Sequence, residues 1–255
     1  MSDAAIRLID IVFPGDTNHH GTLFGGSALA AMDKLAFIAA VRHARVDFVT
    51  ASCDRLDFVA PARLGDIVEF AGRVTRVGRR SLSVELEMTA EAAMGETRRR
   101  CCRGTFTMVA VGERPSAPDY RLPPLVPAAA PSAELSMVEL VMSDQTSHYG
   151  TLYGGQALAA MGKAAFVAAT RHCRRNVVMA ASDHVDFKSG IRQGEIMELT
   201  AELLKVGRSS MTVQVTLRAE NLFSGERRLC CQGQFVMVAQ GDDERPTSVP
   251  PLTGA

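Results

Sequence analysis

The sequence predicts an α+β fold that is built twice along one chain. Residues 21–40 reappear as residues 150–169 with 15 of 20 positions identical, at an offset of 129. Each copy contains one long stretch rich in Ala, Leu and Met, which favours a helix. Segments of alternating polar and apolar residues follow, as at residues 81–88, and favour half-buried strands. We therefore expect two similar domains, each made of one helix and a mostly antiparallel sheet.

The expected elements of the first copy follow in chain order. A strand at residues 5–13 leads through a polar loop to a helix of about 17 residues, which begins at Gly25-Gly26 and ends near His43. The helix is apolar nearly all round, so it is expected to be buried, with a small sheet wrapped around it. The remaining strands are expected at residues 49–58, 67–77, 81–91 and 97–111, with turns at residues 61–66 and 78–80.

The repeat also sets the domain limits. The offset holds downstream without a gap, which places the domains at residues 1–112 and 136–241. The linker, residues 113–135, holds six of the eleven prolines, a composition that favours a stiff, extended connection. The tail, residues 242–255, contains a shorter echo of it, so each domain is expected to end in an extended strap. Two copies in one chain suggest a fused dimer.

Charge and cysteine usage exclude several classes of protein. The formal net charge is zero, so nothing favours nucleic acid or an anionic membrane surface as a partner. None of the six cysteines falls in a C-x-x-C spacing, which argues against zinc. Adjacent pairs such as Cys101-Cys102 fit disulfide geometry poorly, which favours reduced thiols. The first ten residues do not resemble a signal peptide, and no window approaches the ~20 apolar residues of a membrane span. We expect a cytoplasmic protein without a bound metal.

Several motifs together resemble a known family. They are the loop D-T-N-x-x-G at residues 16–21, the pair Gly25-Gly26, the pair Met32-Asp33 and a V-G-R-x-S turn at residues 77–81. This combination resembles the hotdog-fold acyl-CoA thioesterases. The duplication resembles the tandem-domain acyl-CoA hydrolases, and each half is similar to the YciA-type bacterial enzymes. The resemblance covers both repeats, nearly the whole chain outside linker and tail.

The resemblance implies a fold, a reaction and an assembly. It implies two hotdog domains, each an antiparallel sheet wrapped around one long central helix, that pair into a continuous sheet with the thioester sites at their seam. The substrates would be fatty acyl-CoA esters, cleaved by water without a metal or redox cofactor, so that coenzyme A enters only as part of substrate and product. Such tandem chains commonly form homotrimers.

Thioester hydrolysis needs a base or nucleophile and a donor for the developing oxyanion. Asp33, a carboxylate on an otherwise apolar helix, is the candidate for the first role, and its counterpart in the second repeat is Gly162. Free backbone amides at a helix start are the candidate donors, near Gly25-Gly26 or Gly154-Gly155.

Spacing along the helix predicts a composite site. Asp33 lies eight residues after Gly25, about 12 Å at 1.5 Å per residue, so one thioester is not easily served by both. If the helices run antiparallel across the implied seam, Asp33 approaches the start of the other helix. In similar thioesterases an Asn or Gln of the loop faces the Asp. In this sequence the residue expected to face Asp33 is Ser147. The expected catalytic site comprises Asp33, Ser147, His148, Gly154 and Gly155, and an inactive pseudo-site comprises Asn18, Gly25, Gly26 and Gly162.

Coenzyme A carries phosphates, so a local cluster of basic and hydroxyl side chains is expected. Matching turns in the two repeats and two further basic residues supply the candidates. They are Arg79, Arg80, Ser81, Lys188, Arg192, Arg208, Ser209 and Ser210. The run Arg98-Arg99-Arg100 is interpreted instead as solvated strand residues.

Two alternatives to hydrolysis stay open. The same fold supports (R)-hydroxyacyl-CoA dehydration or enoyl hydration, for which His19 or His20 would be the base, although the helix pattern resembles thioesterases more. The loss of one Asp also allows a non-catalytic acyl-CoA-binding protein. His19 and His148 are equivalent, as are His43 and His172, so a structural role is favoured for all four.

Overall fold

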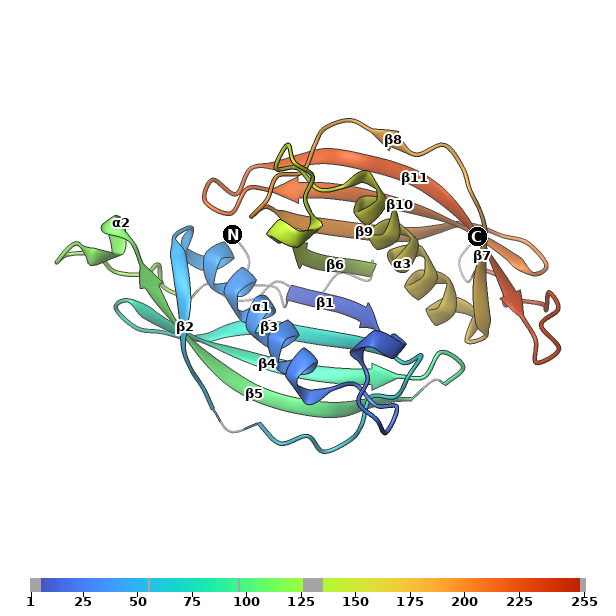
Figure 1. The fold of residues 1–255 in the computed structure, drawn as a ribbon, viewed down its shortest axis with the longest axis horizontal. Coiled ribbons are helices and arrows are strands. Elements are labelled where there is room, and N and C mark those ends of the chain that lie inside the picture. The colour runs from blue at the N-terminus through green and yellow to red at the C-terminus, as the bar shows by residue number, and fades with distance from the viewer. Residues whose placement is uncertain (1–5, 55, 96, 126–134, 253–255) are drawn as a thin grey trace. The chain divides into compact units, whose positions relative to one another are not determined.

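The computed structural model describes residues 6–54, 56–95, 97–125 and 135–252. These residues form two compact units, one built on each repeat. In each unit a single long helix lies against the inner face of a curled antiparallel sheet, as Figure 1 shows. This is the tandem hotdog arrangement that the sequence predicts.

The first unit contains a five-stranded sheet in the order β1-β3-β4-β5-β2, with every neighbouring pair antiparallel. A short 3-10 helix, η1, precedes the long helix α1, and a one-turn helix, α2, follows the sheet. The bounds are β1 Ile6–Ile11, η1 Pro14–Asp16, α1 Gly25–Ala44, β2 Asp47–Cys53, β3 Ile67–Val77, β4 Ser81–Glu91, β5 Arg98–Val111 and α2 Glu113–Ser116.

The second unit repeats this order, with the sheet β6-β9-β10-β11-β7 and a short additional strand, β8, paired with β11. Its bounds are β6 Leu135–Leu140, η2 Ser143–Gln145, α3 Gly154–Cys173, β7 Asn176–Ser182, β8 Asp186–Phe187, β9 Ile196–Val206, β10 Ser210–Glu220 and β11 Arg227–Gln240.

The central helices are buried as expected, because their apolar residues pack on the inner face of the sheet. Leu35 and Ile38 of α1 are fully buried. Close packing requires a glycine on β3: a Cβ at Gly72 would lie 3.3 Å from Leu35 Cγ and 2.8 Å from Leu86 Cδ2. The helix is 20 residues long rather than about 17, and it ends where Arg45 adopts a left-handed conformation, with φ 55°.

One strand prediction was wrong at its end. Residues 49–58 were expected to form a strand, but β2 ends at Cys53. The chain beyond it still runs beside β5, held by single bonds such as Asp54 N–H to Thr105 O (2.9 Å) and Val59 N–H to Cys101 O (2.9 Å). Residues 56–63 therefore form an irregular segment. Part of it, Phe58 to Ala62, lines the cavity described below. The strands at residues 67–77 and 81–91 are confirmed.

The segments after each sheet form straps, as the prolines suggested. In the first unit Leu122 N–H donates to Arg79 O (3.0 Å), and His43 Nε2 lies 2.8 Å from Pro123 O. In the second unit Val249 N–H donates to Arg208 O (2.9 Å), and His172 Nε2 lies 2.8 Å from Pro250 O. The linker is not extended from its start, because α2 forms there. Its residues 126–134 lie outside the described part of the chain.

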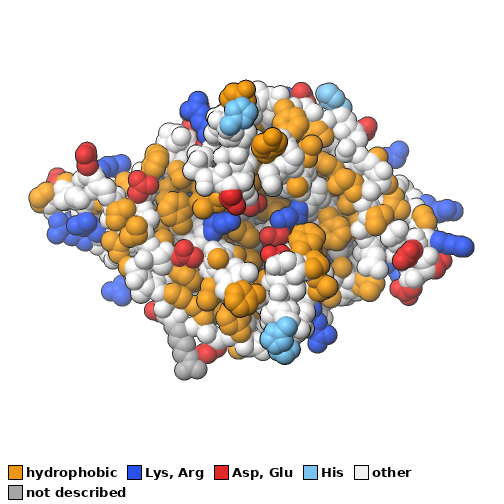
Figure 2. Space-filling view, viewed as in Figure 1, with side chains coloured by type: hydrophobic (Ala, Val, Ile, Leu, Met, Phe, Trp, Pro, Cys, Tyr) orange, Lys and Arg blue, Asp and Glu red, His pale blue; other side chains and the backbone are white. Residues whose placement is uncertain are grey.

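Charged side chains of both signs are mixed on the face that Figure 2 draws, where they lie among apolar side chains. The run Arg98-Arg99-Arg100 was expected to be solvated, but its arginines form ion pairs. Arg98 Nε lies 3.1 Å from Glu91 Oε2, and Arg99 pairs with Asp66. Within the described ranges no helix is long and apolar enough to span a membrane.

Candidate active site

Asp33 is held by a residue that the sequence reasoning did not identify. It lies in the middle of α1 and is half-buried. Thr50, on the neighbouring strand β2, donates a hydrogen bond from Oγ1 to Asp33 Oδ1 at 2.5 Å. Because a hydrogen bond to a charged acceptor is short and strong, this contact fixes the orientation of the carboxylate. The other oxygen, Oδ2, accepts no hydrogen bond from any described residue.

The second repeat has lost both members of this pair. Gly162 stands in place of Asp33, and Met179 of β7 stands in place of Thr50. A Cβ added at Gly162 would lie 2.9 Å from Met179 Cε. The methionine therefore reaches into the space that a longer side chain at position 162 would need, and the carboxylate–hydroxyl pair is replaced by an apolar one.

Cys53 lies near Asp33, and the pKa of its thiol is raised. Burial, together with the negative charges of Asp54 and Asp33, raises the pKa of the exposed Cys53 thiol. A raised thiol pKa lowers the fraction of nucleophilic thiolate at neutral pH. Asp33 is therefore the stronger candidate for base or nucleophile in this part of the unit.

The loop before each helix is held by its own side chains. Asn18 Nδ2 donates to Thr22 Oγ1 (3.0 Å), while Asn18 Oδ1 accepts from the backbone amides of His20 (2.9 Å) and Thr22 (3.3 Å). In the second repeat Ser147 Oγ lies 3.3 Å from Thr151 Oγ1. Asn18 and Ser147 thus share a local, loop-forming role, which accounts for their equivalent positions in the two sequences.

The first backbone amides of a helix have no partner within the helix, so the two helix starts remain the candidate donors. Gly154 and Gly155 are exposed, and a Cβ on either would meet nothing within 4 Å. The surroundings of these two glycines at the start of α3 are therefore open. Gly26 of α1 differs, because its Cβ would lie 2.5 Å from the Phe24 ring. Asp33 is not brought to Gly25 within its own unit, since eight residues of continuous helix separate them.

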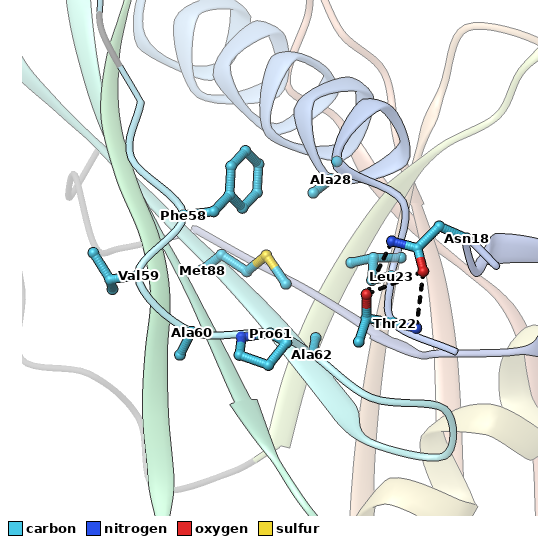
Figure 3. Close-up of a pocket in the computed structure, with 11 residues that line it drawn as sticks. Asn18, Thr22, Leu23, Ala28, Phe58, Val59, Ala60, Pro61, Ala62 and Met88 are labelled. Atoms are coloured by element: carbon cyan, nitrogen blue, oxygen red, sulfur yellow. Dashed lines mark hydrogen bonds between the residues drawn. The ribbon is translucent and has the colours of Figure 1, made fainter. Parts of the chain in front are cut away.

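A cavity of about 360 Å³ opens at the start of α1. Figure 3 shows Leu23, Ala28, Phe58 and Met88 around it, with the hydrogen-bonded pair Asn18 and Thr22 at one side. It also includes Gly25 of the expected pseudo-site, and Asp33 does not line it. The sequence analysis did not identify Phe58 or Met88, although the Asp57-Phe58 dipeptide recurs as Asp186-Phe187.

The predicted phosphate-binding side chains stand in different surroundings. Arg79 is already engaged, because its guanidinium donates to the carbonyl oxygens of Pro118 and Tyr120 in the strap. That contact argues against Arg79 as a phosphate ligand. Arg80, Lys188, Arg192 and Arg208 are exposed. Ser81 and Ser210 are the first residues of β4 and β10, and Ser209 lies in the turn before β10.

The histidines fall into two groups. His43 and His172 anchor the straps, which fits the structural role expected for them. His19 and His20 are exposed, and their rings lie 3.8 Å apart, away from any carboxylate contact that the structure gives. His148 is exposed and stacks near Tyr149 (ring centroids 3.9 Å apart). No cluster of metal-binding side chains occurs among the residues described.

The chain is similar to several proteins named as acyl-CoA hydrolases. The chain is 53% identical to an acyl-CoA hydrolase structure from Agrobacterium tumefaciens, with a TM-score of 0.89 over 98% of this chain and 99% of that one. It is 21% identical to the cytosolic acyl coenzyme A thioester hydrolase of Rattus norvegicus, over 95% of this chain and 76% of the relative. An uncharacterized acyl-CoA thioester hydrolase of Zymomonas mobilis is 33% identical over 51% of this chain and 84% of its own length.

The family model of the thioesterase superfamily matches residues 20–97 and 149–222. These two segments contain both central helices and the Asp33–Thr50 pair, and together they make up more than half of the chain. The chain therefore belongs to the thioesterase superfamily.

Proposed function

We propose that this thioesterase hydrolyses acyl-CoA thioesters to a free fatty acid and coenzyme A, with Asp33 as its general base. The observation that carries the proposal is the hydrogen bond from Thr50 to the Asp33 carboxylate, in a chain whose close structural relative is an acyl-CoA hydrolase. Among the residues expected at the site, Asp33 alone combines a base with a fixed orientation.

The reaction follows from the two carboxylate oxygens. Thr50 occupies Oδ1, so Oδ2 accepts a proton from a water molecule as that water attacks the thioester carbonyl carbon. The negative charge that develops on the carbonyl oxygen is stabilised by backbone amides. The C–S bond then breaks, the acid leaves with the new C–O bond, and the departing coenzyme A thiolate takes up the proton held by Asp33.

We further propose that the backbone amides that stabilise the carbonyl oxygen are those of Gly154 and Gly155, with Ser147 and His148 beside them. Support comes from within each unit: continuous helix places Asp33 about 12 Å from the start of α1, and Gly154 and Gly155 have open space around them. The phosphates would then meet Arg208, Lys188 or Arg192, since Arg79 is occupied by the strap. No resident cofactor is required.

The test is thiol release from a series of acyl-CoAs, comparing the wild type with Asp33→Asn. The amide keeps the size of the side chain and can still accept from Thr50, but it cannot take a proton. We expect a loss of at least about 100-fold in kcat, within the usual contribution of a general base. Asp47→Asn, which changes an exposed carboxylate at the start of β2, is the matched control and should retain activity.

A single turnover in H₂¹⁸O tests for a covalent acyl-aspartyl intermediate that water opens at the aspartyl carbon. If Asp33 activates water, the label appears in the released acid and the protein stays unlabelled. Label in the Asp33 carboxylate would show that an acyl-aspartyl intermediate forms, and the base assignment would be wrong. If the wild type hydrolyses no acyl-CoA, enoyl-CoA hydration becomes the next reaction to assay.

Assembly and location are separate proposals. We propose a homotrimer of tandem chains, which light scattering coupled to size-exclusion chromatography would measure directly. A cytoplasmic location remains a proposal, which rests on the interpretation of the cysteines as reduced thiols and on the name of the rat relative.

A further inference from the structure

The residues that line the cavity at the start of α1 all belong to the first unit, and the cavity is open on one side. Its walls are held by backbone bonds on two sides: Leu23 N–H donates to Ala62 O (2.8 Å), and Val59 N–H donates to Cys101 O (2.9 Å). The floor is Met88, a buried residue of β4. Because these bonds do not involve a ligand, a ligand could enter without refolding the wall.

The lining suits an aliphatic chain and offers no base. Figure 3 shows that the cavity is surrounded by apolar side chains, and no ionisable side chain is among the residues that line it. The polar exceptions, Asn18 and Thr22, are hydrogen-bonded to each other at one side. At that same side Gly25 begins the helix, where a backbone amide can bind a carbonyl oxygen. The cavity thus has an apolar interior and a polar rim.

The second repeat differs at the corresponding wall. The sequence Val59-Ala60-Pro61-Ala62 in the first repeat is matched by Lys188-Ser189-Gly190-Ile191 in the second. An apolar wall has therefore been kept in one copy and replaced by a charged and polar wall in the other. This difference favours binding of an apolar group at the first repeat and makes the two helix starts chemically unequal.

We infer that this cavity is a second, non-hydrolysing site that binds the acyl chain of an acyl-CoA. The identity of the ligand rests on the proposed function, whereas the lack of hydrolysis rests on the lining, which contains no group able to activate water. The volume of about 360 Å³ lies near the lower end of the range of ligand pockets, roughly 300–1,000 Å³, so short and medium chains fit best. The chain thus binds two acyl groups and cleaves one.

The experiment uses the full chain carrying Asp33→Asn, which stops turnover, and S-hexyl-CoA, a thioether that cannot be hydrolysed. Titration calorimetry should give two molecules bound per chain. The wall of the second repeat is then transplanted onto the first by V59K, A60S, P61G and A62I together. Because each new residue already occupies the matching position in the other copy, the fold should tolerate them. We expect one of the two binding events to weaken at least tenfold.

Two further variants guard against a loss of folding. Gly25→Ala places a methyl group 3.8 Å from the Phe58 ring, an ordinary contact, and should weaken the same event. Leu64→Ala changes an exposed residue that does not line the cavity and should leave both events intact. A single bound molecule before transplantation, or two unaltered events after it, would overturn the inference. Two events in a chain whose wild type shows no thioesterase activity would uphold the cavity and reject the proposed function.

Discussion

The contact between Gly162 and Met179 permits a quantitative test of how the second repeat lost its carboxylate pair. Gly162→Asp and Met179→Thr would rebuild in α3 and β7 the pair that Asp33 and Thr50 form in the first repeat. Alone, Gly162→Asp introduces a carboxylate whose Cβ lies 2.9 Å from Met179 Cε, without a donor. Burying an unsatisfied polar group is expected to destabilise the unit by roughly 1–3 kcal/mol.

Met179→Thr alone is expected to lower the stability of the unit by less than Gly162→Asp does. Truncating a fully buried methionine destabilises a protein by about 2–5 kcal/mol, but Met179 is 46% exposed, so about 1 kcal/mol is expected for Met179→Thr. In the double variant the new hydroxyl donates to the new carboxylate, and a hydrogen bond to a charged group contributes about 1.5–3 kcal/mol. The double variant should therefore be less destabilised than the sum of the singles, with a coupling of about 2 kcal/mol.

Amide hydrogen exchange of α3 is the suitable assay, because a chain of two units need not unfold in one step. Gly162→Ala serves as the steric control: it adds the Cβ and improves helix propensity by up to about 1 kcal/mol, but carries no charge. Additivity of the two single changes within about 0.5 kcal/mol would refute the reasoning, since it would mean that the two side chains do not interact.

Three further predictions concern single side chains. Thr50→Val should lower kcat about fivefold through loss of a half-exposed hydrogen bond of about 1 kcal/mol to Asp33, and an unchanged kcat would remove Thr50 from the site. Burial would raise the pKa of Glu195, but the hydrogen bonds from Arg228 outweigh it and hold that pKa below 4.5. The pair therefore stabilises the fold above about pH 4.5 and ceases to do so as the pH falls through the lowered value. Arg228→Met should accordingly lower the urea midpoint at pH 7, with a difference that shrinks in acid, whereas a difference independent of pH would contradict the linkage. His43→Ala should release the first strap and speed its proteolysis, and an unaltered cleavage rate would show that other contacts hold it.

The fold was predictable because its signals are local and occur twice. The Ala/Leu/Met composition of residues 25–44 favours a helix, and the alternation from Ser81 onward favours β4. The end of β2 was not predicted, although Asp54 and Asp57 follow Cys53 and aspartate is depleted in strands. What stops the ladder is the irregular pairing of the residues after Cys53 with β5, where single bonds such as that of Val59 replace continuous pairing.

The site was predictable only in part for a similar reason. Asp33 can be singled out from the sequence by itself, because it is a carboxylate on an otherwise apolar helix. Thr50 is an ordinary residue in a strand rich in β-branched and apolar residues, and only the packing of β2 beside α1 makes it a donor. The contact of Arg79 with the strap was not predictable, because the sequence context, a Gly-Arg turn, is the same whether the guanidinium meets a phosphate or the strap.

The joint replacement of Asp33 and Thr50 by Gly162 and Met179 has a consequence for how such a protein can evolve. In a dimer of identical subunits, every substitution appears in both copies, so a change that abolishes catalysis in one site abolishes it in the other. Once two copies share one chain, each position can vary independently. The second repeat could then accept Gly162 and Met179 while the first repeat retained its own pair, and the released position became available for selection on stability, ligand choice or assembly.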